Sequence, residues 1–315
     1  MNKLFSKIVA SSKSLPVSIR VNSHIANLRE RKIIEGLLLP AACFKYAINN
    51  KKIKYKRKKI DLCVIIKNEA PYIGEWIKYH KLLGIENFYI FNNDSTDALD
   101  NVLHPFLAEG NVHLYNLSGK VRQLDAYNIG LKLARKSGNY LLVLDADEFL
   151  FLRDESDNIT ELVNHFFKNN KLAGGIVFNW CIFGSSHFVK KQSGLVTQIY
   201  THRSNFDFEN NKNVKSLVDP ERTVAFTNPH FATYYRNYQA FNLQGKAVEG
   251  PYSNPIDNPR VRINHYFTKS KEEFLAKRSR GMADSIGIRD MQDFETHDRN
   301  EVFDDSMKRY ADFLK

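Results

Sequence analysis

The chain has 315 residues, of which 43% are hydrophobic and 12% aromatic, so it is long enough to bury one large core or two modest ones. Its net charge of +11 lies at the N-terminus, because residues 1–60 contain 15 Lys and Arg against two Glu, whereas the rest contain 31 basic and 33 acidic residues. No run of 18 apolar residues occurs, which excludes a membrane-spanning helix of ordinary length from the sequence. The three cysteines, Cys43, Cys63 and Cys181, lack the spacing of a metal site and indicate a reducing compartment.

Residues 1–59 are predicted to form a basic extension with one helix, from about Ser23 to Leu39. The first residues begin like a signal peptide, but Lys13 and the serines around it interrupt the apolar part, so we expect none. The run 51–59 is attracted to anionic lipid by about 1 kcal/mol per charge near the surface, and such a run also attracts nucleic acid. We expect a cytoplasmic protein, peripheral at the inner face of the membrane through residues 51–59, with no nucleic-acid partner. A solvated linker without a dedicated partner is the alternative.

From Ile60 the chain alternates between strand-like and helix-like patterns, which predicts an α/β fold with a mixed, mostly parallel sheet flanked by helices. The apolar run 60–66 is the first expected strand. Asn68 can cap the helix that follows, Pro71 is tolerated in its first turn, and Gly84 ends it. Further strands are expected at 87–91 and 111–117, and a further helix at about 124–136.

Residues 140–150 read as one buried strand that delivers three carboxylates in four positions. In extended backbone Asp145 and Asp147 point the same way, about 7 Å apart, whereas Glu148 points to the other side and is expected to be structural. Two like charges at the mouth of an apolar strand repel each other unless a cation lies between them, and oxygen ligands suit Mg²⁺ or Mn²⁺. Because ligands of open α/β sheets collect at the carboxyl ends of strands, we predict a metal site here. The alternative is a solvated turn.

Beyond this stretch the pattern predicts fewer elements. Apolar residues at positions 159, 162, 163, 166 and 167 predict an amphipathic helix, and residues 175–180 predict a strand. From there to about residue 266 the periodicity is weak, and residues 267–280 have a helical pattern. Most of the tail is polar and is expected at the surface, with one side of a last helix docked through Phe303, Met307, Tyr310 and Phe313.

Several segments, in the same order along the chain, resemble a known group of enzymes. They are Lys67-Asn68-Glu69, Glu75 to His80, Gly84, Phe88 to Asp97, Leu144-Asp145-Ala146-Asp147-Glu148-Phe149-Leu150, Trp180 to Ser186, and Ile263-Asn264-His265-Tyr266 with Lys269-Ser270 and Glu273-Phe274. The set resembles the glycosyltransferase family 2-like group that includes glycosyltransferase family 92. The resemblance implies a GT-A (Rossmann-like) domain over residues 60–282, between the extension 1–59 and a C-terminal helical tail 283–315. It also implies transfer of a sugar from a nucleotide-sugar, with inversion.

The nucleotide-sugar donor is expected at the neighbouring ends of the first two strands. The resemblance adds the start of the helix at about 124–136 as a border of the donor pocket. The expected nucleotide-sugar-binding residues are Lys67, Asn68 and Glu69, then Asn93, Asp94 and Ser95, then Arg122 and Gln123, and finally Asp145 and Lys215. Arg122 suits a phosphate oxygen, although an exposed helix-start position explains it equally. Asn92 and Asn93 stand where ordinary family 2 enzymes have acidic residues, so the sequence does not decide which nucleotide base the donor carries. A UDP-sugar is the first expectation.

A divalent cation, Mn²⁺ or Mg²⁺, held by Asp145 and Asp147 would neutralise the charge that develops on the leaving diphosphate. The resemblance adds a histidine as third ligand, either His265 or, alternatively, His230. Inversion also needs a base beside the acceptor hydroxyl, and sequence order alone offers Asp219, Glu221 and His187. The expected acceptor is a glycan or a lipid-linked molecule, as in surface polysaccharide synthesis.

Two other functions stay open. A nucleotidyltransferase also uses paired aspartates with Mg²⁺, but it predicts a Gly-rich or basic phosphate loop near the first strand, and residues 67–71 lack glycine. A non-catalytic α/β scaffold that binds membrane or nucleic acid through the basic run predicts that Asp145 and Asp147 are dispensable.

Overall fold

The computed structural model describes residues 53–254, 259–279 and 290–314. The predicted helix from Ser23 to Leu39 lies outside these residues. The helices are α3 (Ala70–Leu82), α4 (Leu99–Ala108), α5 (Gln123–Ser137), α6 (Ile159–Asn169), α7 (Val196–Ile199), α8 (Lys271–Ser279), α9 (Met291–His297) and α10 (Ala311–Leu314), with 3-10 turns η2 (Glu209–Lys212) and η3 (Ser306–Tyr310). The strands are β1 (Ile60–Ile66), β2 (Asn87–Asn92), β3 (Val112–Asn116), β4 (Tyr140–Val143), β5 (Glu148–Leu152), β6 (Ala173–Ile182), β7 (His202–Arg203), β8 (Val214–Val218), β9 (Thr223–Phe226), β10 (Ala232–Tyr234), β11 (Gln239–Phe241), β12 (Ala247–Val248), β13 (Val261–His265) and β14 (Val302–Phe303).

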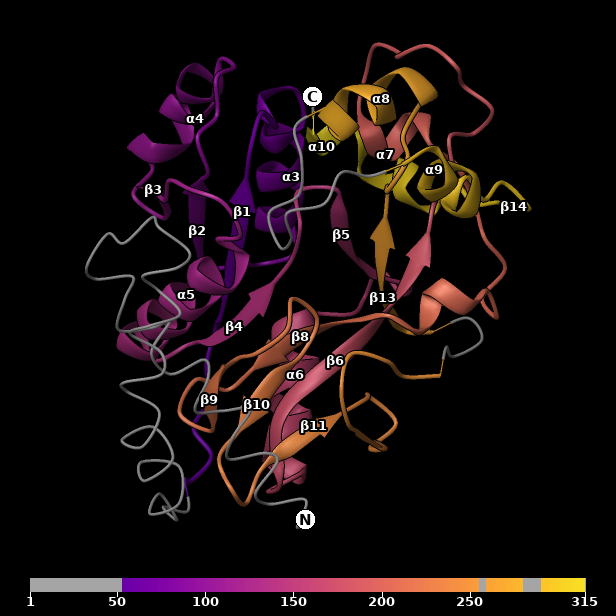
Figure 1. Ribbon diagram of the computed structural model, residues 1–315. Helices are drawn as coiled ribbons and strands as arrows, with labels where there is room; N and C mark the ends of the chain where they lie inside the picture. The colour runs from indigo at the N-terminus through magenta and orange to yellow at the C-terminus, as the bar shows by residue number, and fades with distance from the viewer. Residues whose placement is uncertain (1–52, 255–258, 280–289, 315) are drawn as a thin grey trace.

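One ten-stranded sheet organises the described chain, and its main path runs β12-β11-β6-β8-β4-β1-β2-β3. Strands β4, β1, β2 and β3 are parallel to one another and form one half of the sheet, at the left of Figure 1. Strand β8 runs antiparallel to both β4 and β6, and β13 joins the sheet by pairing parallel with β6 and antiparallel with β5. The predicted mixed, mostly parallel α/β sheet is confirmed.

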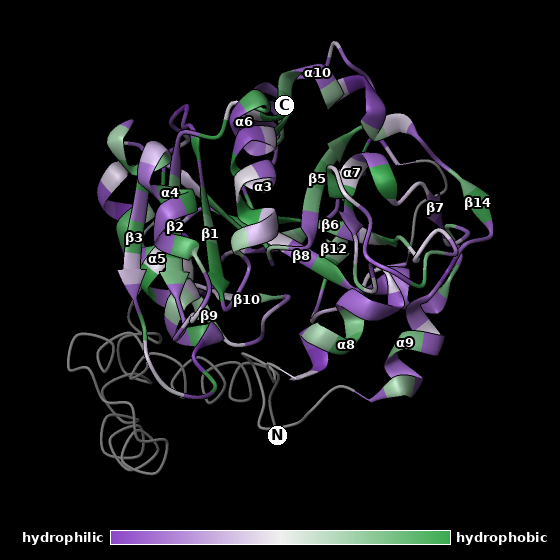
Figure 2. Ribbon diagram, turned by 90° about the horizontal axis from the view of Figure 1, so that it is seen from above, coloured by the Kyte–Doolittle hydropathy of each residue, from purple (hydrophilic) through white to green (hydrophobic). Residues whose placement is uncertain are grey.

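The central strands of the sheet are buried on both faces and are mostly apolar. Every residue of β1 and β4 is buried, and β1 is hydrophobic along most of its length in Figure 2. One core cluster contains side chains of α3, α4 and α6, whereas α5 contributes to the cluster on the other face together with β9 and β10. The sheet is therefore a rigid platform, and the loops at its strand ends are held in place by two cores.

The predicted strand 140–150 is wrong in one respect. The chain ends β4 at Val143, makes a turn through Asp145–Asp147, and begins β5 at Glu148. The amide of Glu148 donates to the carbonyl of Asp145 over 3.1 Å and closes the turn. Because the backbone is not extended here, the expected separation of the side chains onto two faces does not apply.

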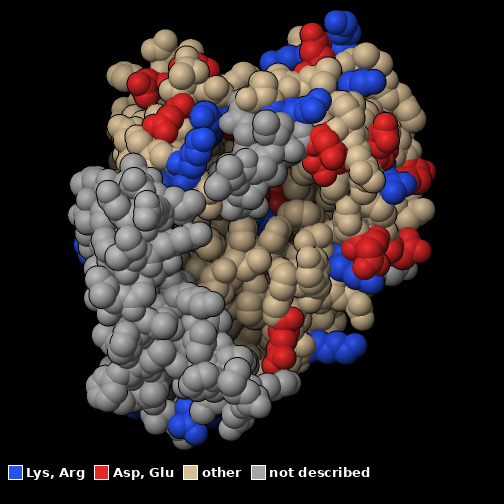
Figure 3. All heavy atoms as spheres, viewed as in Figure 1, with Lys and Arg blue, Asp and Glu red and all other residues tan. Residues whose placement is uncertain are grey.

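The described part of the basic run belongs to the folded domain. Lys58 is 8% exposed, and its ammonium donates to Asp219 over 2.7 Å and to Glu221 over 3.2 Å. Lys58 therefore binds carboxylates of the domain, and membrane contact through the run 51–59 stays a prediction. On the face shown in Figure 3, the Lys and Arg side chains of the described residues lie among Asp and Glu side chains along the top and the right-hand side.

The C-terminal tail packs on the domain through fewer side chains than expected. Met307 is 1% exposed and Tyr310 is partly buried against the core, as predicted. Phe303 and Phe313 are 60% and 67% exposed, so their predicted docking is wrong, and Leu314 is the buried residue of α10. In the described residues no helix is both long enough and apolar enough to cross a membrane.

His80 links α3 to β5 and gives the fold a pH dependence. Its ring is buried, Nε2 accepts from the amide of Leu150, and burial lowers its pKa to about 3. The unfolded chain takes up a proton below about pH 6.5 while the folded chain does not, so stability falls as the pH drops from 6.5 towards 3.

We expect the His80→Gln variant, which keeps an acceptor for Leu150, to lose less stability with acid than the wild type. The difference in slope should reach at most about 1.4 kcal/mol per pH unit in this window, measured by urea unfolding. His165→Gln on the exposed face of α6 is the matched control and should keep the wild-type slope. Parallel curves for wild type and His80→Gln would contradict the assignment.

Candidate active site

The loops after β1 and β2 form one hydrogen-bonded unit at the carboxyl end of the parallel sheet. The amide of Asn68 donates to Ser95 Oγ over 3.0 Å, and the amide of Thr96 donates to Asn68 Oδ1 over 2.7 Å. The predicted capping role of Asn68 is wrong, because Asp97 Oδ2 accepts the amide of Ala70 at the start of α3 instead. The sequence thus located both loops, and the structure brings them together.

Asp94 connects this unit to the loop before α5. Its backbone is left-handed (φ 57°), and its carboxylate accepts the amide of Gly119 over 3.0 Å. The pKa of Asp94 lies below its usual value, first because of Gly119 and the Ser118 hydroxyl, and to a lesser extent because of Lys67 and Arg122. The predicted donor residues from three separate loops therefore lie together.

Arg122 is buried, not exposed as the alternative interpretation required. It is 2% exposed, it is the N-cap residue of α5, and its Nε lies 3.2 Å from Asp125 Oδ2. Asn93 is also buried, and its amide nitrogen donates to the carbonyls of Leu117 and Gly119. Both side chains stabilise the loop that leads into α5.

Asp145 is held by three donors from two elements. Gln123 Nε2 and the Tyr127 hydroxyl donate to Oδ1 over 2.8 and 3.0 Å, and Lys215 Nζ lies 2.9 Å from Oδ2. Burial raises the pKa of Asp145, but the ammonium of Lys215 outweighs it, so this pKa lies below its ordinary value. Asp145 is therefore an anion with a fixed orientation at the end of β4.

Glu148 turns towards this group, which corrects the expectation that it points away. Its Oε2 accepts the amide of Asp145 over 2.8 Å and lies 3.3 Å from Lys215 Nζ. Burial raises the pKa of Glu148 to about 8 although Lys215 opposes the shift, and burial lowers the pKa of Lys215 less than the two carboxylates raise it. Lys215 and Glu148 are both fully buried, and one ammonium lies within 3.3 Å of the carboxyl groups of Asp145 and Glu148.

Asp147 faces the C-terminal half of the chain. Its Oδ1 lies 3.5 Å from His265 Nε2, and its Oδ2 accepts the ammonium of Lys277 from α8. Burial raises the pKa of Asp147, but Lys277 and His265 bring it well below its usual value. Strand β13 delivers His265 because it pairs with β5, where His265 lies opposite Glu148. In Figure 1, β13 runs upward towards α8 and α9.

The second histidine candidate lies beside this group. His230 Nδ1 faces the carbonyl of Val214 at 3.1 Å, and its ring packs edge-on against Trp180 at 5.0 Å. Trp180 also packs against His265, with ring centroids 4.3 Å apart. The indole therefore contacts both histidines, and among the described residues His265 is the histidine that lies within 4 Å of carboxylates of the turn.

The candidates for an acceptor base lie elsewhere. Asp219 and Glu221 follow the other end of β8 from Lys215, about 13 Å further along the strand, where Lys58 binds both. Asp219 also lies 3.2 Å from Arg222 Nε, so it is part of a buried ion-pair network and its prediction as a base is wrong. His187 is exposed, with its ring 5.5 Å from that of His202.

The family model of glycosyltransferase family 92 matches residues 58–284, which is more than half of the chain. The chain belongs to glycosyltransferase family 92. Family 92 protein At1g27200 of Arabidopsis thaliana is 26% identical over 246 residues, covering 74% of this chain and 40% of that protein. Family 92 protein Os08g0121900 of Oryza sativa subsp. japonica is 27% identical over 247 residues, covering 78% and 39%. The chain thus spans about two fifths of the length of these curated relatives.

Among solved structures, S. aureus TarS 1–349 matches with a TM-score of 0.33 and 14% identity, over 51% of this chain and 47% of that chain. The same protein in complex with UDP matches with a TM-score of 0.33 and 13% identity. Because these TM-scores are low, the fold is described from the order of the strands in the sheet alone.

Resemblance to family 92 and its relatives implies a divalent cation, and the donor set at Asp147 suits one. Two ligands that each lie about 2.1 Å from one ion are at most about 4.2 Å apart, so the 3.5 Å between Asp147 Oδ1 and His265 Nε2 fits. Within residues 53–254, 259–279 and 290–314 no group of three or more His, Cys, Asp and Glu side chains is placed to hold a metal. Mg²⁺ commonly takes one or two protein carboxylates and completes its shell with phosphate and water, so a two-residue site fits the family 92 chemistry.

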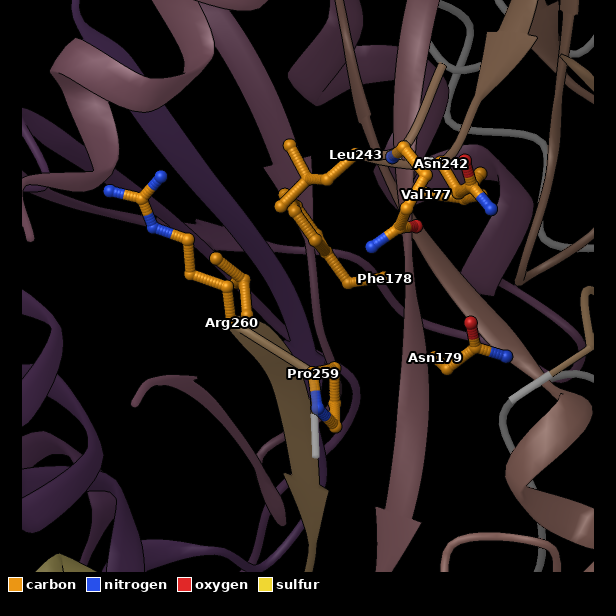
Figure 4. A pocket seen from close by; sticks show the side chains of 9 residues that line it. Val177, Phe178, Asn179, Asn242, Leu243, Pro259 and Arg260 are labelled. Carbon is orange, nitrogen blue, oxygen red and sulfur yellow. Dashed lines mark hydrogen bonds between the residues drawn. The ribbon is translucent and has the colours of Figure 1, made fainter. Parts of the chain in front are cut away.

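A pocket elsewhere in this family 92 domain lacks such chemistry. It is lined by Val177, Phe178, Asn179, Asn242, Leu243, Gln244, Pro259, Arg260 and Val261. In Figure 4 the guanidinium of Arg260 and the amide of Asn179 point away from each other. Asn179 donates to the carbonyls of Asn211 and Ser253, and Arg260 pairs with Asp157, so these polar groups do not converge on the pocket. The candidate site is therefore the turn that carries Asp145, Asp147 and Glu148, which we call the carboxylate turn.

Two residues of the site were not predicted from the sequence, although helical spacing places each of them on the same helix face as a predicted residue. Tyr127 lies four residues after Gln123, so both side chains reach the same carboxylate from one face of α5. Lys277 lies four residues after Glu273, which the resemblance had singled out with Phe274, and both lie on one face of α8. The spacing places Lys277 with Glu273, but only the packing of α8 shows that this face meets Asp147.

Proposed function

We propose that the protein is a glycosyltransferase that moves a sugar from a nucleotide-sugar, first of all a UDP-sugar, to a glycan or lipid-linked acceptor. Membership of family 92 supports the reaction type. The observation that carries the proposal is the carboxylate turn, in which Asp145 and Asp147 are held ionised at the carboxyl end of β4, beside the joined loops of β1 and β2. This edge of an open α/β sheet is where nucleotides bind.

The proposed donor site divides its work between two groups of residues. Asn68 and Ser95 fix the loops against which the nucleoside lies, and Lys67 and Arg122 add positive charge beside Asp94. Asp147 and His265 would hold a divalent cation, which supplies a Lewis acid for the charge of the leaving diphosphate. Gln123, Tyr127 and Lys215 keep Asp145 oriented, so that no side chain has to reorganise when charge develops.

The sugar is proposed to lie on the side of Trp180. This indole is half-buried next to His265, and its Nε1 is a buried donor without a hydrogen-bond partner in the described structure. A buried donor that lacks a partner loses the energy of one hydrogen bond, and a sugar hydroxyl is a suitable acceptor. Inversion at the anomeric carbon, a role in surface polysaccharide synthesis and a place at the inner face of the membrane remain predictions from the resemblance and the basic N-terminus.

The proposal differs from its two rivals in measurable ways. A nucleotidyltransferase would release pyrophosphate from a nucleoside triphosphate, and a non-catalytic scaffold would keep its binding when the carboxylates are removed. Lys58, one cation of the run that a scaffold would use, is bound to Asp219 and Glu221 inside the domain. The glycosyltransferase proposal requires the carboxylates.

Calorimetric titration of UDP into the purified full chain, with Mn²⁺ and then with EDTA, tests the proposal. We expect binding that depends on Mn²⁺ and is lost in an Asp145→Ala/Asp147→Ala variant, which must first be shown to fold by its circular dichroism. UDP-sugars are then screened for hydrolysis to UDP. If UDP, GDP, CDP and TDP all fail to bind the wild type, the donor-site assignment is wrong. If only a nucleotide other than UDP binds, the glycosyltransferase proposal stands and the donor carries that nucleotide instead.

A further inference from the structure

Two ammonium groups, one from strand β8 and one from helix α8, compensate the carboxylate turn. Lys215 of β8 serves Asp145 and Glu148 and is fully buried. Lys277 of α8 serves Asp147, and its side chain is 11% exposed. Lys277 also donates to the carbonyl of Phe267 over 3.0 Å and lies over the Phe267 ring at 4.4 Å. Lys215 thus lies beneath the turn, whereas Lys277 reaches it from the covering helix.

The position of Lys277 is set by an anchored helix. One turn earlier, the carboxylate of Glu273 accepts the hydroxyls of Tyr72 and Tyr200 and the amide of Ser270. This network ties the first turn of α8 to α3 and to the residue that follows α7. Because residues four apart lie on one face of a helix, the anchor at Glu273 directs Lys277 towards Asp147.

The ion pair between Lys277 and Asp147 conflicts with the proposed cation. Asp147 presents Oδ1 to His265 and Oδ2 to Lys277, so a divalent ion at Oδ1 would lie close to an ammonium at Oδ2. The two positive groups repel each other and share one carboxylate as their counter-charge. Occupation of the metal position therefore weakens the hold of Asp147 on Lys277.

We propose that Lys277 is a donor-binding residue that rests on Asp147 in the nucleotide-free protein and moves to the donor diphosphate when nucleotide and divalent cation bind. The inference rests on the proposed function and names one of its phosphate ligands. A lysine suits this move, because its four-carbon stem is flexible and its ammonium binds phosphate as a point charge. Without nucleotide, Lys277 and the metal ion compete for Asp147. With nucleotide bound, both bind its diphosphate.

The test measures two affinities in the full chain, for Mn²⁺ alone and for UDP with saturating Mn²⁺. The Lys277→Met variant should bind Mn²⁺ alone roughly 3–10-fold more tightly, because the competing ammonium is gone. The same variant should bind UDP roughly 10–100-fold more weakly, because one charge-assisted hydrogen bond is lost. Opposite changes in the two affinities distinguish this role from simple damage to the site, which would weaken both.

Two further variants serve as controls. Lys277→Arg keeps the cation and should retain wild-type Mn²⁺ affinity and most of the UDP affinity. Lys271→Met removes an exposed lysine from the same helix and should match the wild type in both measurements. If Lys277→Met does not fold, Lys277→Gln, which keeps a donor for Asp147 but carries no charge, takes its place.

The outcomes separate the two proposals. Unchanged Mn²⁺ affinity or unchanged UDP affinity in the Lys277 variant, with a wild type that binds UDP, overturns the role of Lys277 and leaves the glycosyltransferase proposal intact. A wild type that binds no nucleotide with Mn²⁺ overturns the proposed function and, with it, the phosphate role of Lys277.

Discussion

Replacing Asp147 with asparagine is expected to reduce kcat/KM for donor turnover by about 10²–10³-fold, or roughly 3–4 kcal/mol of transition-state stabilisation. Asparagine has nearly the same shape but no charge, so it loses the anion that faces His265 and Lys277. The measurement is the rate of UDP release from the UDP-sugar that the wild type hydrolyses fastest.

The dependence on Mn²⁺ makes this prediction specific. The Asp147→Asn variant should need a higher Mn²⁺ concentration for half-maximal rate, because it lacks one of the two proposed protein ligands. Asp100→Asn, an exposed aspartate of α4, is the matched control and should stay within about twofold of the wild type. An Asp147→Asn enzyme with wild-type kcat/KM and wild-type Mn²⁺ dependence would show that the turn does not hold the donor.

Replacing Lys215 with methionine is expected to lower the free energy of unfolding by about 3–5 kcal/mol. Methionine fills a similar volume, but it leaves the fully buried Glu148 and the partly exposed Asp145 without the ammonium that lay 3.3 and 2.9 Å from them. Removing one partner of a buried ion pair is costly because the remaining charge has neither water nor a counter-ion. Urea unfolding at pH 7 gives the value.

A second substitution tests the cause. At pH 9, where Glu148 is ionised, the Lys215→Met/Glu148→Gln double variant carries one buried carboxylate fewer, so it should recover part of the stability that Lys215→Met loses. Burial already raises the pKa of Glu148 to about 8, which indicates that a neutral side chain is tolerated at this position. A double variant that is less stable than the sum of the two single variants would contradict the assignment of the loss to repulsion between carboxylates.

The fold class and the edge of the sheet that carries the site were predictable from local patterns. Apolar runs such as 60–66 predict buried strands of a mostly parallel sheet, and the loops that follow them were identified with Asn68 and Ser95 in them. In the same way, the spacing in 159–167 predicted α6. These signals are local because periodicity depends only on which face of an element is buried.

The sequence by itself therefore determined a mixed, mostly parallel α/β sheet, the loops at its carboxyl edge and the position of Asp145 and Asp147 next to an apolar strand. Only the tertiary structure decided how these carboxylates are compensated, because their partners come from elements far apart in the chain. Lys215 is 70 residues from Asp145, and Lys277 is 130 residues from Asp147. The pairing of β13 with β5 that delivers His265 is likewise long-range. Residue spacing carries no information about such pairs, since they are fixed by the order of strands in the sheet and by the packing of α8 over its edge.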